Sequence, residues 1–265
     1  MSTTATSTQR PSTRQTGCYV YGIVPADAEL PADAYGVGAP PARVTLVPYG
    51  DIAALVSTVD VGQPIGRPDD FIAHERLLDT TAANVPVLPL RFGAVVTNTD
   101  AVAEDLLAAH HDDFAKALAQ LAGRVQYVVR CRYVEPVLLA EILAENPEAA
   151  SLRTQMRDLP TELTHDVRIR LGELVSQAIE AKRGADTTAV VDALAEHCVA
   201  SAARPASHEH DAAHVALLAE KAHEAPLAKA VDQLARDWDG RVTVQLLGPL
   251  APYDFVTTLS PGHGA

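Results

Sequence analysis

Positive charge is scarce in this sequence of 265 residues. Lys and Arg together number 21 against 34 Asp and Glu, which gives a formal net charge of −13 and a pI near 5.1. Non-specific binding to a nucleic acid or to an anionic membrane surface requires clustered Lys and Arg, so this balance argues against both. Apolar runs are also short, and none reaches the roughly 18 residues that a membrane-spanning helix needs.

Cysteine and aromatic residues are scarce as well. The three cysteines, Cys18, Cys131 and Cys198, are odd in number and far apart, which is typical of free buried thiols in a reducing cytoplasm. Aromatic residues make up only 5 %, so we expect a core built from Leu, Val and Ala. Residues 1–17 are rich in Ser and Thr and lack the apolar stretch of a signal peptide, and we expect a disordered tail there.

Motifs of catalysis and nucleotide binding are missing too. The sequence has no phosphate-binding GxxxxGK[ST] and no GxSxG nucleophile turn. Gly36 and Gly38 precede a proline pair, so no helix can begin there to bind a pyrophosphate. His74 and Glu75 start like a zinc-protease helix, but Leu78 stands at the position of the second histidine. We therefore expect no enzymatic activity, no cofactor and no metal centre.

One histidine cluster leaves an alternative open. His208, His210 and His214 lie close together in the sequence, not far from Cys198. A His-x-His pair can ligate zinc or copper, but the cluster lacks a paired cysteine and also fits an exposed polar loop. The alternative function is therefore a small-molecule- or metal-binding α+β protein that uses the loop between His208 and His214.

Two proline-containing blocks stand out among the residues that are present. They span residues 86–93 (PVLPLRFG) and 248–256 (GPLAPYDFV). Proline lacks an N–H, so neither block suits a helix interior or a central strand. Neither contains a nucleophile or a set of metal ligands, which points to packing or to a partner, with Arg91 suited either to a partner carboxylate or to a local ion pair. The candidate partner or interdomain residues are Pro89, Arg91, Phe92, Gly93, Gly248, Pro249, Pro252, Tyr253 and Phe255.

The first half of the chain predicts several strands before its main helix. Strands are expected at residues 18–24, 44–47 and 52–59, and a helix at 68–83. Extended chain follows through residue 97. Asn98 and Thr99 then cap a single helix that ends at Gly123.

The second half begins with an alternating, half-buried strand at 125–133. Helix is expected over 136–183 with breaks near Pro147 and Pro160, followed by another helix capped by Asp186. Strands at 198–202 and 214–219 flank a polar loop, and a helix at 227–238 precedes a strand at 242–246. This order is that of a split βαβ, ferredoxin-like sandwich with extra helix in the first crossover. The expected parts are a domain at 18–123, a second at 124–247 and an extended tail at 248–265.

Six segments together resemble the gas vesicle protein F/L family (GvpF/GvpL). They are residues 19–24, 52–57, 74–76, 87–93, 168–175 and 248–256, and their order and spacing fit from about residue 18 to 256. Ala251 stands where the family often has a second proline, and Gln126 where an acidic residue is common. These departures leave F-type and L-type both open.

The resemblance implies a two-domain α+β protein whose second domain is a modified ferredoxin-like fold. It also implies a non-enzymatic cytoplasmic role in gas vesicle assembly, with the hydrophobic shell protein (GvpA-like) and other accessory proteins as partners. On this basis we expect the two proline blocks near the domain junction, with one of them contributing to the partner surface. A regulatory ligand-binding domain of ferredoxin-like type is a further alternative.

Overall fold

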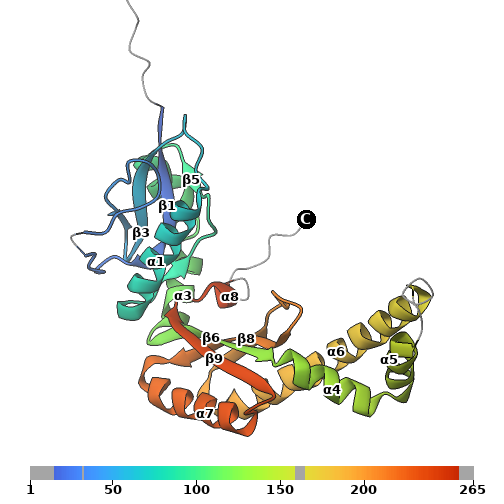
Figure 1. Cartoon of the computed structure of the whole chain (residues 1–265). Coiled ribbons are helices and arrows are strands. Elements are labelled where there is room, and N and C mark those ends of the chain that lie inside the picture. The colour runs from blue at the N-terminus through green and yellow to red at the C-terminus, as the bar shows by residue number, and fades with distance from the viewer. Residues whose placement is uncertain (1–14, 32, 159–164, 257–265) are drawn as a thin grey trace, which may run out of the picture. The chain divides into compact units, whose positions relative to one another are not determined.

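The computed structural model of the chain describes residues 15–31, 33–158 and 165–256. These residues form a mixed helix and sheet fold with two antiparallel sheets, which confirms the predicted α+β class (Figure 1). They divide into two compact units between Gln120 and Leu121.

The first unit is built on a sheet whose central strand is almost entirely buried. Its strands are β1 (Thr16–Pro25), β2 (Thr45–Tyr49), β3 (Ile52–Asp60), β4 (Leu88–Pro89) and β5 (Val95–Val96). The order is β2-β3-β1-β4, with β5 also paired to β1. The predicted strands around residues 18–24, 44–47 and 52–59 are thus confirmed.

Helix α1 (Pro68–Asn84) follows the predicted helix closely. Proline at its first position and two acidic residues in its first turn favour the start of a helix here. Val85 is extended, as expected for the residue before a proline, and the helix ends there. The inner face of α1 contributes Leu77 and Leu78 to the core of the first unit.

The single helix predicted from Asn98 to Gly123 is wrong. The chain forms α2 (Thr99–Ala101), a π-helix η1 (Val102–Ala108) and α3 (His111–Leu121), with the Asn98 side chain accepting a hydrogen bond from the Ala101 N–H at 2.8 Å. The π-helix packs against β2 and β3. Val102 and Leu107, five residues apart, are both fully buried, which matches the wider period of a π-helix.

The second unit contains the other sheet, with the order β7-β8-β6-β9. Its strands are β6 (Arg124–Tyr133), β7 (Ala200–Ala203), β8 (Asp211–Glu220) and β9 (Val242–Leu250). The elements follow the predicted order of strand, helices, strand, strand, helix, strand. The ferredoxin-like classification stays an interpretation of this order.

Helices cover one face of this second sheet. Their buried faces meet Val125, Tyr127, Val129, Cys131 and Tyr133 of β6 in one apolar core. The contributing helices are α4 (Glu135–Glu145), α6 (His165–Leu194) and α7 (Glu224–Asp237). Helix α5 (Pro147–Asp158) packs on α4 and α6, beyond the sheet (Figure 1).

One prediction in this unit is wrong and another holds only in part. Helix α6 continues past Arg183 to Leu194, and Asp186 lies inside it instead of capping a new helix. The Asp186 carboxylate accepts hydrogen bonds from Tyr133 at 2.6 Å and from Arg241 at 2.8 Å, so tertiary contacts hold the helix over this stretch. Strand β6 is half-buried only toward its end, because Gln126 and Val128 on its second face are buried whereas Arg132 on that face is exposed.

The remaining predictions concern breaks and tails. The break near Pro147 is confirmed between α4 and α5, whereas Pro160 and residues 1–14 lie outside the described residues. The segment predicted as an extended tail from residue 248 continues β9 to Leu250 and then forms the short helix α8 (Tyr253–Val256).

Candidate functional site

The first half of the block at 86–93 belongs to the core of the first unit. Val87, Leu88 and Pro89 are buried, and β4 pairs antiparallel with β1 so that Pro89 lies opposite Gly22. The Leu90 N–H donates to the Tyr21 carbonyl at 2.9 Å. Strand β4 lies at the edge of its sheet, where a proline removes no ladder hydrogen bond.

The second half of the block reaches the surface. Arg91 and Gly93 are exposed and Phe92 is half-buried. The Phe92 ring stacks on Phe71 of α1, with ring centroids 4.0 Å apart and planes inclined by 22°. Phe71 itself is 45 % exposed. We call Phe71, Arg91 and Phe92 the Phe71–Phe92 surface.

A buried polar pair lies beneath this surface. Tyr19 of β1 and His74 of α1 are 0 % and 2 % exposed, and the Tyr19 hydroxyl lies 3.0 Å from His74 Nδ1. The Gly93 N–H donates to the same hydroxyl at 2.9 Å. The Tyr19 hydroxyl therefore joins the Gly93 N–H to the His74 ring.

Burial sets the charge state of both groups. Burial raises the pKa of Tyr19 to about 12, although the Gly93 N–H opposes the shift. Burial lowers the pKa of His74, against an opposing hydrogen bond with the Leu90 backbone. Both side chains are therefore neutral near pH 7, and their arrangement positions residues 90–93 without offering an accessible acid or base.

Asp70 organises the start of α1 in the same unit. Its buried carboxylate accepts hydrogen bonds from the N–H groups of Gly38 at 2.9 Å, Arg67 at 3.0 Å and Gly66 at 3.1 Å. Burial alone would raise the pKa of Asp70, but these donors together lower it well below its usual range. The carboxylate thus fixes two loops to α1 and has a structural role.

Arg91 does not fit the interpretation as a locally paired arginine. Among the ion pairs and hydrogen bonds within the described residues, none involves its guanidinium group, and the side chain is exposed. An exposed guanidinium of this kind remains available to a carboxylate of a partner.

The closing block lies in the second unit, where most of it is packed. Gly248 adopts a φ of +140°, and a Cβ added there would lie 2.6 Å from the Tyr127 ring and 3.0 Å from the Gln126 carbonyl. Only glycine fits this position. Pro249 follows in β9, half-buried, and Pro252 is buried.

Helix α8 is fixed to the sheet through Asp254. Its carboxylate accepts a hydrogen bond from Gln126 Nε2 at 2.6 Å and pairs with Arg204 Nε at 3.1 Å, and its N–H donates to Gln126 Oε1 at 3.1 Å. Phe255 is 5 % exposed, and Tyr253 is half-buried. This arrangement explains the glutamine at position 126, because its amide serves as donor and acceptor to one residue.

The candidate residues are divided between the two units. Pro89, Arg91, Phe92 and Gly93 belong to the first unit, whereas Gly248, Pro249, Pro252, Tyr253 and Phe255 belong to the second. The sequence did not single out Tyr19, Phe71 and Gln126 as parts of these groups. Their contacts join residues that lie 21 to 128 positions apart in the chain, and local pattern carries no signal of such contacts.

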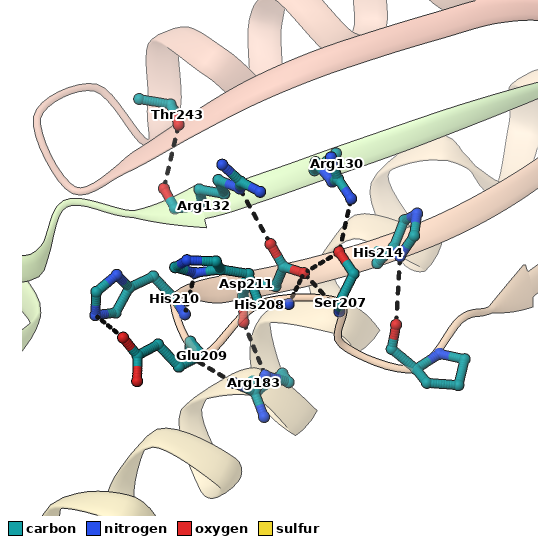
Figure 2. A network of polar contacts seen from close by, with 11 residues as sticks. Arg130, Arg132, Arg183, Ser207, His208, Glu209, His210, Asp211, His214 and Thr243 are labelled. Carbon is teal, nitrogen blue, oxygen red and sulfur yellow. Dashed lines mark hydrogen bonds and ion pairs between the residues drawn. The ribbon is translucent and has the colours of Figure 1, made fainter. Parts of the chain in front are cut away.

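The loop of residues 204–211 is a well-ordered turn around Asp211 (Figure 2). The fully buried Asp211 carboxylate accepts from the Ser207 N–H, the Ser207 hydroxyl and the His208 N–H at 2.8–2.9 Å, and from Arg132 Nε at 3.2 Å. Arg183 donates to the carbonyls of Glu209 and Asp211, each at 2.8 Å.

The histidines of this loop are engaged locally. His208 Nδ1 accepts from the His210 N–H at 3.2 Å, and His214 Nδ1 lies 3.3 Å from the Pro205 carbonyl. Within residues 15–31, 33–158 and 165–256, no three His, Cys, Asp or Glu side chains gather in a way that could hold a metal ion. Among the helices in the described part of the chain, none is long and apolar enough to cross a bilayer.

Comparison with known proteins gives one consistent family. The family model described as "Gas vesicle synthesis protein GvpL/GvpF" matches residues 17–257. Gas vesicle protein F of Streptomyces sp. (strain CB03234) is 31 % identical over 242 residues, covering 90 % of this chain and 98 % of that protein. Gas vesicle protein L of the same strain is 29 % identical over 251 residues, covering 89 % and 91 %.

Solved structures share the fold. The crystal structure of GvpF from Anabaena sp. PCC7120 aligns with a TM-score of 0.70 at 22 % identity, covering 94 % of this chain and 98 % of that one. GvpF from Microcystis aeruginosa gives a TM-score of 0.70 at 21 % identity, covering 91 % and 98 %.

Proposed function

The chain belongs to the GvpL/GvpF family of gas vesicle synthesis proteins, and from this membership we propose that it is a non-enzymatic assembly or minor structural component of gas vesicles. It binds the hydrophobic shell protein (GvpA-like) and other accessory proteins during vesicle formation, in the cytoplasm. The observation that carries the proposal is the family match over residues 17–257.

The chemistry of the described residues supports a binding role. The buried Tyr19–His74 pair and the Asp70 carboxylate all have structural partners, and their pKa shifts have structural causes. Groups that serve backbone N–H donors and aromatic packing are not positioned to act on a substrate. These features favour a scaffold that presents a surface.

The Phe71–Phe92 surface fits an apolar partner. A shell subunit exposes apolar area before it assembles, so a soluble partner must cover that area. The stacked rings of Phe71 and Phe92 offer apolar area at the surface, and the hydrogen bond from Gly93 to Tyr19 holds the chain beside them in place. A surface ordered in advance lowers the entropy cost of binding. We therefore assign the partner contact to this block.

The closing block has another role in this proposal. Ala251, Pro252 and Phe255 are buried and Asp254 is bonded to Gln126 and Arg204, so few of its side chains are available to a partner. We assign this block to packing of α8 within the second unit.

The test is co-purification. The tagged chain is co-expressed with the shell protein of the same organism and recovered through its tag, and the bound shell protein is quantified. We expect recovery with the unmodified chain and a loss of about tenfold with Phe71→Ala or Arg91→Ala, since a well-packed aromatic or Arg contact is worth about 1–2 kcal/mol or more.

The matched control is Ile169→Ala, because Ile169 is a 51 % exposed apolar residue in the second unit. Circular dichroism confirms that each variant is folded. No recovery by the unmodified chain would contradict the function, whereas equal recovery by all folded variants would contradict only the assigned surface.

A further inference from the structure

Basic side chains gather on one face of the second sheet although the chain as a whole is acidic. Arg130 and Arg132 on β6 and His214 on β8 lie on the face opposite the helices, and Arg204 follows β7 beside them. Figure 2 shows Arg130 and Arg132 side by side, both directed toward the loop of residues 204–211. We call Arg130, Arg132, Arg204 and His214 the basic cluster.

Three of these side chains, those of Arg130, Arg204 and His214, are close enough to influence one another. Arg204 Nη1 lies 3.4 Å from His214 Nε2, and Arg130 pairs in register with His214 across the strands. Burial lowers the pKa of His214, and the charges of Arg204 and Arg130 lower it further. The His214 ring is therefore neutral near pH 7, with Nδ1–H toward the Pro205 carbonyl and Nε2 accepting from Arg204.

The local carboxylates do not balance these guanidinium groups. Asp211 pairs with Arg132 at 3.2 Å, and Asp254 pairs with Arg204 at 3.1 Å. Among the described residues, Arg130 donates only to the Ser207 hydroxyl, at 2.6 Å. Its Nε atom is buried and has no hydrogen-bond partner among the described residues. A buried N–H of a charged group without an acceptor is costly, so Arg130 is less well stabilised than Arg132 and Arg204, which each have a carboxylate partner.

The surroundings are polar, accessible and already ordered. Thr243 and Gln245 of β9 lie opposite Arg132 and Arg130 and are exposed. Strand β9 is an edge strand, so its outer side is unpaired within the sheet. Asp211 and Arg183 fix the loop that carries Ser207 through six hydrogen bonds. Little ordering would accompany binding at this place.

We propose that the basic cluster binds an acidic peptide segment of a partner protein, with a Glu or Asp carboxylate accepting from the guanidinium group of Arg130. Arginine recognises carboxylates through paired N–H groups, and Arg130 has no carboxylate partner among the described residues. This surface lies in the second unit, whereas the Phe71–Phe92 surface, to which the shell-protein contact is assigned, lies in the first.

The net charge of the chain limits which kind of ligand can bind at the basic cluster. A chain of net charge −13 repels a long polyanion such as a nucleic acid, which needs many cationic contacts along its backbone. A short acidic segment needs only the few contacts that the cluster provides. Because the rest of the chain repels it, such a segment binds at the basic cluster or not at all.

The test is fluorescence anisotropy with a fluorescein-labelled peptide of six glutamates, titrated with the full-length chain at low salt. We expect saturable binding by the unmodified chain, and a loss of about tenfold in affinity for Arg130→Gln. Arg153→Gln is the matched control, because Arg153 is exposed on α5 and the charge change is the same. A labelled hexalysine peptide should not bind to this cluster, and Arg130→Gln should not change its affinity.

Several results would overturn the proposal. They are an absence of saturable binding by the unmodified chain, or an equal loss of affinity in Arg130→Gln and Arg153→Gln. Displacement of the peptide by inorganic phosphate below the peptide's own dissociation constant would instead assign the cluster to small anions. If Arg130→Gln proves unfolded by circular dichroism, Arg130→Lys keeps the charge and loses the paired geometry, so it should still bind several-fold more weakly than the unmodified chain.

Discussion

At the scale of single residues, Tyr19 connects the core of the first unit to its surface. Its hydroxyl accepts from the Gly93 N–H at 2.9 Å and lies 3.0 Å from His74 Nδ1. One buried oxygen thus holds both α1 and the exposed end of the proline block. Because Phe71 lies on α1 and Phe92 on the block, the same oxygen supports the stacking of the two rings.

Removing the Tyr19 hydroxyl should increase the mobility of the backbone at Gly93, beside the Phe71–Phe92 surface, more than that of the core. We expect Tyr19→Phe to lower the free energy of unfolding by about 1–3 kcal/mol, because the Gly93 N–H and His74 lose a buried partner. Urea unfolding measures this change, and amide hydrogen exchange should become faster at Gly93. Tyr35→Phe, at a tyrosine that is 56 % exposed, should change stability by less than about 0.5 kcal/mol. An unchanged exchange rate at Gly93 in Tyr19→Phe would show that the hydroxyl does not position the block.

At the scale of helices and strands, local pattern predicted the elements that depend on local physics. Alternation predicted β6 and β9, and apolar residues at helical spacing predicted α1 and α7. The pattern failed where distant contacts decide. The π-helix η1 follows from packing on β2 and β3, and α6 continues because Asp186 is held by Tyr133 and Arg241.

The candidate site divides in the same way. The two proline blocks could be recognised from their composition, because proline and glycine restrict the backbone wherever they occur. The residues that contact these blocks could not be recognised from the sequence. Phe71, Tyr19 and Gln126 come into contact with the blocks only after the sheets have folded. The basic cluster was missed for the same reason: Arg130 and Arg204 come together only through the pairing of β6, β8 and β7.

The continuity of α6 can be tested at a glycine in its interior. Gly184 lies inside the helix, and a Cβ added there meets nothing within 4 Å. We expect Gly184→Ala to raise the free energy of unfolding by about 0.5–1 kcal/mol, because alanine restricts the unfolded chain and favours helix. Gly240 is the matched control. A Cβ added there would also meet nothing within 4 Å, but Gly240 has a φ of +76°, in the left-handed region that alanine disfavours.

Gly240→Ala should therefore lower the free energy of unfolding by about 1 kcal/mol. Urea unfolding of both variants measures whether the free energy of unfolding rises in Gly184→Ala and falls in Gly240→Ala. Destabilisation by Gly184→Ala would mean that the backbone around this residue is not the regular helix that the contacts of Asp186 require.

At the scale of the whole molecule, each unit depends on one buried carboxylate. Asp70 accepts three backbone N–H groups in the first unit, and Asp211 accepts two N–H groups, a hydroxyl and Arg132 in the second. Burial alone would raise the pKa of either group, but these donors lower both. Because of these lowered pKa values, the free energy of unfolding of both units depends on pH in the acid range.

The sign of the effect follows from the direction of the two shifts. A carboxyl group whose pKa is lower in the folded state stabilises the fold above its unfolded pKa of about 3.9, and this contribution is lost as the pH falls through the folded pKa. We therefore expect the free energy of unfolding to fall steeply below about pH 4. Urea unfolding followed by circular dichroism between pH 7 and pH 2.5 measures this dependence.

Single substitutions distinguish the contributions of Asp70 and Asp211 to this acid dependence. Asp70→Asn and Asp211→Asn should each lower stability by about 2–4 kcal/mol at pH 7 and make the acid dependence shallower, because each removes one linked proton. Asp69→Asn changes the adjacent but exposed carboxylate and should leave both quantities nearly unchanged. If Asp70→Asn and Asp69→Asn gave the same acid dependence, the buried hydrogen bonds of Asp70 would not be its source, and the acid sensitivity would have to come from the general charge of the chain.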